Sequence, residues 1–244
     1  MARSDDNTVI SQHSGWLATG LVIGLIGLGA LLRMAALEYK SFERTVNVKG
    51  LAEREYPADV VIWPIQFTAA DNDLARLYAT VDESTNRIRA FLMERGIGAE
   101  EISSSSPAIT DKSAQSYGGG SPAPFRYSAV QTVTVYSGNV DTVRAAMPSL
   151  SDLGRTGIVF SGDQYQTQVE YVFTRLNEIK PDMVEEATRN AREVAEKFAE
   201  DSESRLGKIK RASQGQFSIY ARDRNNPQIK KVRVVSTVEY YLAD

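Results

Sequence analysis

The side chains that most often carry out catalysis or bind metals are nearly absent from this 244-residue chain. It has no cysteine and a single histidine, His13. The lack of cysteine excludes disulfide bonds, thiolate nucleophiles and cysteine-bound zinc or iron–sulfur sites. One histidine cannot build a histidine-based catalytic triad or a multi-histidine metal site. The chemistry left to the chain is that of carboxylates, hydroxyls, amines and guanidinium groups.

Two acidic clusters are the candidates for acid–base or metal chemistry. Asp182, Glu185 and Glu186 lie where a helix is predicted to begin, a position at which the helix dipole favours carboxylates. Residues 71–73, Asp-Asn-Asp, resemble the start of a calcium loop but lack its glycine and its twelfth-position glutamate. We interpret the first cluster as a helix start and the second as a helix cap. We therefore predict no catalytic residue, no metal site and no cofactor.

The remaining polar groups also have structural explanations. A nucleophile among Ser103–Ser106 would need a positioned base, and only an amine such as Lys112 is near it in the sequence. The glycines at 118–120 do not form a phosphate loop, because no Lys-Ser/Thr follows them. Arg222–Pro227 predicts a polar hairpin turn, with an anionic partner as the alternative. The pattern predicts that the protein is not an enzyme, and a hydrolase without histidine is the minor alternative.

The composition is that of a folded protein with a hydrophobic core. Charged residues make up 24% and hydrophobic residues 42% of the chain, which excludes global disorder and a polytopic membrane protein. The formal net charge is −3, and this argues against a nucleic acid as partner. The length allows one large domain or two small ones.

An apolar segment near the N-terminus has the length of a membrane span. Residues 16–32 contain no charged side chain, and residues 34–37 continue the apolar character after Arg33. A helix of this length spans roughly 25–33 Å, which matches a bilayer core of about 30 Å. We predict a polar tail over residues 1–15, a transmembrane helix over 16–37 and a linker over 38–44. A cleaved signal peptide is the alternative, although Ala35-Ala36 makes a weak cleavage site.

Three glycines in this segment predict a second role for the helix beside contact with the lipid bilayer. Gly20 and Gly24 form a small-xxx-small pair, and Gly27 follows about one turn later. Such a face lets two membrane helices approach closely, so Gly20, Gly24 and Gly27 are the predicted membrane-helix packing residues. The alternative is that glycine is simply common in membrane helices.

The charges beside the segment favour one orientation. Basic residues are more frequent after it than before it: Arg33, Lys40, Arg44 and Lys49 follow the apolar run, whereas Arg3 precedes it. The positive-inside rule would keep the large C-terminal part in the cytoplasm.

Strand and helix patterns alternate from Thr45 onward. Alternating apolar residues predict strands at 45–50, 61–67, 102–112, 125–136, 158–162, 168–174, 209–221 and 229–242. Pro64 lies inside the second of these strands, which predicts an edge strand or a bulge. Helices are predicted from the cluster at 71–73 to Gly96, over Val140–Leu150, and from Pro181 to Leu206 with Gly207 as the cap. The fold class is α+β, with antiparallel sheets and helices on one face.

The apolar stripe of the long helix is predicted to face a sheet or another helix. Its members are Val184, Ala187, Ala191, Val194, Ala195 and Phe198. The first predicted helix has an apolar stripe as well. Its members are Leu74, Leu77, Tyr78, Val81, Ile88, Phe91 and Leu92.

The order and spacing of several short motifs resemble the SIMPL-domain family over residues 45 to 242. The motifs are Val48-Lys49-Gly50, Pro57-Ala58-Asp59-Val60, Arg126-Tyr127, Ile158-Val159-Phe160, Glu186-Ala187, Asn190-Ala191-Arg192, Ala195, Phe198-Ala199 and Leu206-Gly207-Lys208-Ile209. The second motif is an altered form of the family's Pro-Asp-hydrophobic pattern. The resemblance implies one SIMPL-like α+β domain over residues 45–244 and supplies no catalytic residue.

The resemblance also implies a location and a role. It implies a bacterial envelope protein, anchored by a single span in the inner membrane with its main domain in the periplasm, which opposes the orientation favoured by the charges. It further implies a non-enzymatic protein that forms a homo-oligomer and acts as an envelope scaffold or in a stress response. The alternative is a periplasmic ligand-binding or sensing module, whose small-molecule ligand the sequence does not identify.

Overall fold

The computed structural model describes residues 20–35, 44–114, 124–161 and 168–243. The predicted tail of residues 1–15, the two ends of the predicted span, nearly all of the linker and the glycines at 118–120 lie outside these residues. The chain divides into two compact units. The first consists of residues 1–52, 182–216 and 234–244, and the second of residues 53–181 and 217–233. Each unit is described by itself.

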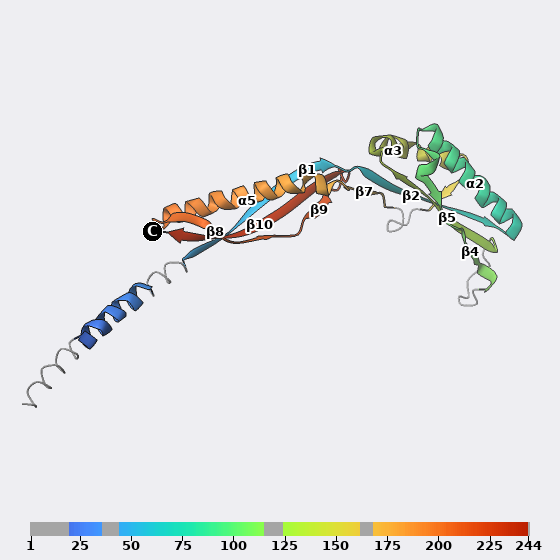
Figure 1. Ribbon diagram of the computed structural model, residues 1–244. Coiled ribbons are helices and arrows are strands. Elements are labelled where there is room, and N and C mark those ends of the chain that lie inside the picture. Colours follow the sequence, from blue (N-terminus) through green and yellow to red (C-terminus); the bar gives the residue numbers. More distant parts are fainter. Residues whose placement is uncertain (1–19, 36–43, 115–123, 162–167, 244) are drawn as a thin grey trace, which may run out of the picture. The chain divides into compact units, whose positions relative to one another are not determined.

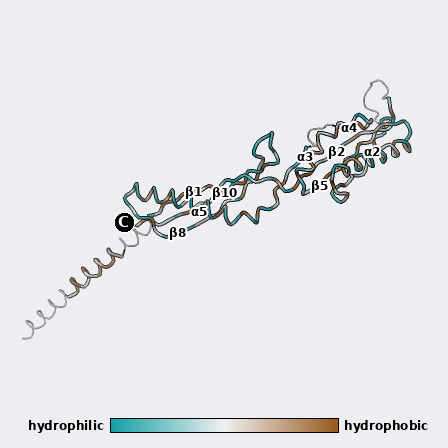
Figure 2. Tube along the Cα trace, turned by 90° about the horizontal axis from the view of Figure 1, so that it is seen from above, coloured by the Kyte–Doolittle hydropathy of each residue, from teal (hydrophilic) through white to brown (hydrophobic). Residues whose placement is uncertain are grey.

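Residues 20–35 form a helix of largely hydrophobic residues (Figure 2). Its large apolar side chains are all exposed. They include Leu21, Ile26 and Leu31, each about two-thirds exposed. Within the described residues, no helix combines the length and the hydropathy that crossing a membrane requires.

The first unit is a sheet with one long helix along it (Figure 1). The sheet has the order β1-β10-β8, and β10 also pairs with β9. The elements are β1 (Thr45–Pro57), α5 (Leu176–Asp201), β8 (Arg205–Gln214), β9 (Ser218–Ala221) and β10 (Ile229–Ala243). Strands β1 and β10 and helix α5 each continue from one unit into the other, and β9 belongs to the second unit.

Helix α5 lies very close to β1 because small residues meet at the contact. Its buried residues follow one another at a spacing of four: Met183, Ala187, Ala191, Ala195 and Ala199. At Gly50 of β1, a Cβ atom would overlap the backbone oxygen of Ala187 and the backbone nitrogen of Ala191. The side-chain amide of Asn190 donates to the carbonyl of Leu51 at 2.8 Å and ties the same two elements together.

This close approach makes the buried stripe of α5 narrower than the sequence predicts. The alanines of the predicted stripe are buried, but Val194 is 39% and Phe198 is 55% exposed. The prediction that these two residues face the core was wrong. A helix that touches a sheet through alanine and glycine presents a single i, i+4 row to it, so the residues on either side of that row remain outside.

Both ends of α5 also differ from the prediction. The helix begins at Leu176 rather than at Pro181, which lies inside it. It ends at Asp201, and the chain leaves it through Glu203, whose φ is +52°. Gly207 is therefore not the cap but a residue of β8, where a Cβ atom would lie 2.9 Å from the carbonyl oxygen of Tyr241.

The second unit is built on a six-stranded sheet with helices packed against it (Figure 1). Its strand order is β3-β5-β2-β6, with β4 on β5 and β7 on β2. The strands are β2 (Val60–Asp71), β3 (Ile102–Ser104), β4 (Ala108–Asp111), β5 (Tyr127–Ser137), β6 (Val159–Phe160) and β7 (Glu170–Val172). The helices are α2 (Leu74–Glu94), α3 (Val140–Ala146) and α4 (Leu150–Arg155), with short 3-10 turns η1 (Ala99–Glu101), η2 (Lys112–Ala114) and η3 (Met147–Ser149). The fold is thus α+β with antiparallel sheets, as predicted.

Strand β2 is an interior strand, so the prediction of an edge or a bulge at Pro64 was wrong. It pairs with β5 without a break from Val61↔Ser137 to Asp71↔Tyr127. On its other side, β7 pairs with residues 60–62 and β6 with residues 67–68, which leaves residues 63–66 between them. Residues two apart on a strand direct their backbone groups to the same side, and the carbonyl of Gln66 accepts from Ser161 on this side. Pro64 therefore lacks its N–H at a position where none of the described residues provides a ladder partner.

The core of the second unit is formed by the residues that the periodicity predicts. Val61, Trp63, Ile65 and Phe67 of β2 are buried, together with Leu77, Val81, Ile88, Phe91 and Leu92 of α2. Leu74 and Tyr78, which belong to the predicted stripe of α2, are exposed. Asp73 caps the helix by accepting from the N–H of Arg76, and Gly96 follows it with a φ of +85°. Both ends of α2 are as predicted.

Candidate functional site

The side chains of residues 71–73 cap helix α2 and connect its start to β4 and β5. Asp71 accepts from the N–H of Asp73 at 2.8 Å, and Asn72 accepts from the N–H of Arg126 at 2.9 Å. Arg126 in turn holds Asp111 at 3.0 Å and, with Ser113, lowers the pKa of that carboxyl to about 2. These groups use their charge in local contacts that join the start of α2 to β4 and β5. In the described part of the chain, no three His, Cys, Asp or Glu side chains are grouped as a metal site would require.

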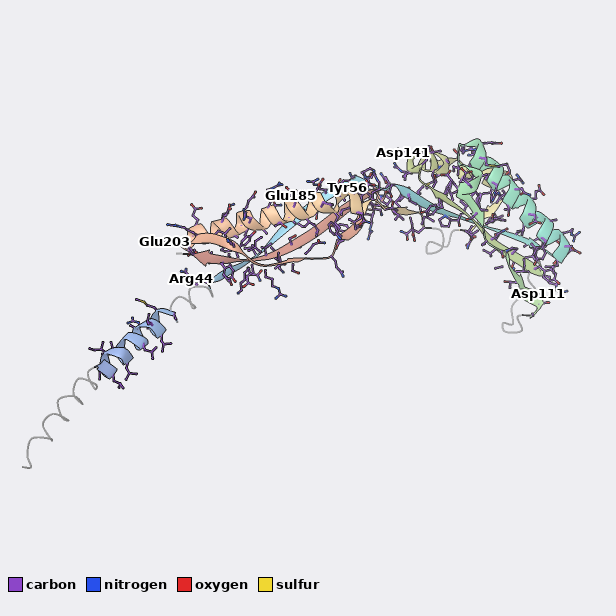
Figure 3. The ribbon with its side chains drawn as sticks, in the orientation of Figure 1. Arg44, Tyr56, Asp111, Asp141, Glu185 and Glu203 are labelled. Atoms are coloured by element: carbon purple, nitrogen blue, oxygen red, sulfur yellow. The ribbon has the colours of Figure 1, made fainter. Side chains whose placement is uncertain are left out.

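The predicted helix-start cluster does not lie at the helix start. Because α5 begins at Leu176, Glu178 is its first-turn acid, and Asp182, Glu185 and Glu186 lie beyond that turn. Glu185 lies on the exposed side of α5 (Figure 3). The dipole explanation for these three residues was therefore wrong.

The serines at 103–106 are used structurally as well. The hydroxyl of Ser103 donates to the carbonyl of Thr134, and that of Ser105 donates to the carbonyl of Ser106. The strand predicted over 102–112 is interrupted after Ser104, because residues 105–107 separate β3 from β4. Gly20, Gly24 and Gly27 lie on the N-terminal helix, where, apart from chain neighbours and the backbone of the helix itself, no described atom comes within 4 Å of a Cβ built at any of them.

The connection between β1 and β2 organises a different group of residues. Asp59 directs its carboxylate at the residues before α5: it accepts from the N–H of Thr174 at 2.8 and 3.1 Å and from the Thr174 hydroxyl at 3.0 Å. Arg175 adds an ion pair to the same carboxylate at 3.3 Å. Nearby, the rings of Tyr56 and Phe173 stack with 5.3 Å between centroids. All of these residues belong to the second unit.

The backbone of the same connection holds two further segments. The N–H of Ala58 donates to the carbonyl of Gln228 in the β9–β10 hairpin at 2.8 Å. The N–H of Asp59 donates to the carbonyl of Val172 in β7 at 3.0 Å. The hairpin and β7 are therefore held on either side of one short segment of chain.

The tip of the β9–β10 hairpin is locked by Asp223. Its carboxylate accepts from the N–H groups of Asn225 and Asn226 at 2.8 and 2.9 Å and from Arg222 Nε at 2.9 Å. The Arg222 hydrogen bond, followed by those from Asn226, lowers the pKa of Asp223 to about 2. The carboxylate is thus ionised and fully engaged down to about that pH. The predicted polar turn at Arg222–Pro227 is confirmed, and its order comes from side-chain hydrogen bonds.

A hollow of about 680 Å³ lies between β7 and this hairpin tip. Its lining residues within the described chain are Gln168, Val169, Tyr171, Ala221, Asp223, Arg224 and Pro227. The sequence pattern predicts the turn but not the residues at and just before β7 that line the hollow with it. No local signal joins residues 168–171 to residues 221–227, because their contact depends on the β1–β2 connection that holds both segments.

Most of the chain matches the sequence profile of one known protein family. Residues 46–240 match the profile of SIMPL, described as a protein of unknown function (DUF541). The chain belongs to the SIMPL family. No curated protein matches the sequence at a significant level.

Three of the motifs that resemble the SIMPL family contain residues at close contacts of the two units. Val48-Lys49-Gly50 includes the glycine that admits α5, and Pro57-Ala58-Asp59-Val60 includes the residues that hold β7, the hairpin and the start of α5. Gly207, in Leu206-Gly207-Lys208-Ile209, lies against the backbone of Tyr241. These motifs of the chain therefore have a structural explanation in close packing and backbone hydrogen bonding.

Proposed function

We propose that this SIMPL-family protein is a non-enzymatic, membrane-anchored envelope protein that self-assembles into a homo-oligomer. The anchor would be the apolar segment of residues 16–37, whose described part is a helix with exposed apolar side chains. The main domain would lie in the periplasm of a bacterial cell, attached to the inner membrane by a single span. The role would be that of an envelope scaffold, with a function in stress tolerance.

The polar contacts of the described residues support a non-enzymatic role. Asp71, Asp111 and Asp223 have depressed pKa values because each accepts hydrogen bonds from neighbouring arginines and backbone N–H groups. A general base at neutral pH would instead need a pKa near 7 and reach to a substrate. These carboxylates serve as structural acceptors.

The observation that carries the assembly proposal is the outer edge of β8, with which no other strand of the described residues pairs. This strand is last in the order β1-β10-β8, and nearly all of its ten residues are exposed. The N–H of Gly215 donates inward to the carbonyl of Val235, so the N–H groups of Ala212 and Gln214, at odd spacing from it, are directed outward. An edge of this kind is a template for another strand.

A second copy of β8 fits this edge. In antiparallel pairing about a twofold axis at Ala212, that residue faces its own copy and Arg211 faces Ser213 of the second copy. No arginine at position 211 then faces another, which matters because like charges opposite each other destabilise a sheet. Such a contact uses the same surface on both subunits, as most dimeric interfaces do.

Replacing Ala212 with proline tests the assembly. Proline removes an outward N–H while leaving the β8–β10 ladder unchanged, so the two central hydrogen bonds of the interface are lost. We expect the Kd for self-association of the full chain to rise at least tenfold, equivalent to about 1.4 kcal/mol. Light scattering on the detergent-solubilised protein, with the detergent mass subtracted, measures this change.

Two controls show whether a loss of assembly comes from the missing N–H or from misfolding. Ala212→Ser keeps the backbone N–H and should assemble like the wild type. Circular dichroism should show the same folded content for both variants. An unchanged oligomer in Ala212→Pro would refute the proposed role of β8, and a monomeric wild-type chain would refute self-assembly itself.

Single-cysteine labelling tests the anchor and its orientation, because the chain has no native cysteine. Ser218→Cys is exposed on β9, and Ser4→Cys precedes the apolar segment. In intact spheroplasts we expect a membrane-impermeant maleimide to modify residue 218 at once and residue 4 only after lysis. The reverse pattern would place the domain in the cytoplasm, as the charge distribution favours. Labelling of both residues, with the protein in the soluble fraction, would exclude the anchor.

A further inference from the structure

We infer that the hollow between β7 and the β9–β10 hairpin tip binds a small molecule that carries a carboxylate on a compact apolar body. The site lies wholly in the second unit. It is independent of the anchor and of β8, so its failure would leave the proposed function unchanged.

The walls of the hollow provide the apolar part of the site. Tyr171 of β7 and Val169, which directly precedes that strand, line one side, and Ala221 and Pro227 of the hairpin line the other. The volume of about 680 Å³ is within the range of small-molecule pockets, roughly 300–1,000 Å³. Tyr171 and Val169 also pack against the hydrophobic core, so this wall is supported from behind.

Arg224 provides the charge. Arg224 lines the hollow, and among the described residues its side chain has no hydrogen bond or ion pair. The neighbouring Asp223 forms its ion pair with Arg222 rather than with Arg224, and it also accepts from Asn225 and Asn226. Arg224 has no partner within the described chain, and the hydrogen bonds of the adjacent carboxylate are already made. This arrangement favours the binding of an anion from outside the chain.

The geometry of the guanidinium selects the kind of anion. Its planar fork donates two parallel hydrogen bonds to a carboxylate. The side-chain amide of Gln168, which also lines the hollow, can donate or accept beside it. The four apolar residues then accommodate an aromatic or aliphatic group, which a simple inorganic anion lacks. The site therefore favours compact organic acids over phosphate or acetate.

The probe for this site is 3-phenylpropionate, used with the full-length protein in amphipol. Isothermal titration should give saturable binding in the millimolar range or tighter. Two matched ligands separate the two parts of the site, since 3-phenylpropanamide lacks the charge and acetate lacks the apolar body. Both should bind at least tenfold more weakly than 3-phenylpropionate.

Substitutions at Arg224 test whether 3-phenylpropionate binds in the hollow. Arg224→Gln should raise the Kd for 3-phenylpropionate at least tenfold, and Arg224→Lys should give an intermediate value because it keeps the charge but loses the fork. Arg233→Gln removes an exposed arginine at the other end of the same hairpin and should change nothing. Because Arg224 is exposed, the melting temperature of each variant should equal that of the wild type.

Three binding results would contradict the proposed site. Absence of saturable binding by the wild type would exclude the site for this class of ligand. Equal affinity in Arg224→Gln and wild type would place the binding elsewhere, in the amphipol or on another surface. Equal affinity for the amide would refute the role of the carboxylate.

Discussion

Gly50→Ala is expected to destabilise the first unit by about 3 kcal/mol, the upper part of the range for overpacked cores. The added Cβ would overlap the backbone of α5 at Ala187 and Ala191, and backbone cannot move aside as a flexible side chain can. The helix would have to withdraw from β1, which would also break the 2.8 Å hydrogen bond from Asn190 to Leu51. Urea denaturation followed by circular dichroism measures the loss.

A second glycine provides the matched control for this prediction. Gly154 lies in α4, and the nearest atom to a Cβ built there is 4.0 Å away in the ring of Phe160. Gly154→Ala should therefore be neutral or slightly stabilising, because alanine is the better helix former. Equal stability of Gly50→Ala and wild type would show that α5 does not rest on β1 as closely as described.

Asp59→Ala should be the next most costly substitution, at about 2–3 kcal/mol. The carboxylate is only 17% exposed and accepts from the backbone and hydroxyl of Thr174 while pairing with Arg175. Hydrogen bonds to a charged group contribute about 1.5–3 kcal/mol, and removing the acceptor leaves its partners unsatisfied. Compared with the wild type, amide hydrogen exchange should increase most at residues 174–180. The reason is that the segment leading into the first turn of α5 loses the carboxylate of Asp59 as its hydrogen-bond acceptor.

Two further variants separate the contributions at this position. Asp59→Asn keeps an oxygen acceptor for Thr174 but loses the charge, so it should cost about half as much as alanine. Asp82→Ala removes an exposed carboxylate on α2 and should change stability by less than about 0.5 kcal/mol. If Asp59→Ala unfolds at the same urea concentration as Asp82→Ala, the connection does not anchor α5.

Local patterns in the sequence were sufficient for the parts of the fold that depend on neighbouring residues. The alternation at Val61, Trp63, Ile65 and Phe67 predicted the buried face of β2, because a strand directs every second side chain to one side. The cap at Asp73 and the positive φ of Gly96 bound α2 where predicted, since both depend on a few adjacent residues. The family, too, was evident from short motifs in order.

The tertiary structure decided what depends on residues far apart in the chain. Asp59 lies 115 positions before Thr174, so no pattern near Pro181 could place the start of α5 at Leu176. Gly50 brings α5 so close to β1 that Phe198 remains exposed although its spacing suits a buried stripe. Pro64 is accommodated inside a sheet because, among the described residues, neither β6 nor β7 pairs with it. The hollow at Arg224 lies between the hairpin and β7, which Ala58 and Asp59 hold by backbone hydrogen bonds that have no side-chain signature in the sequence.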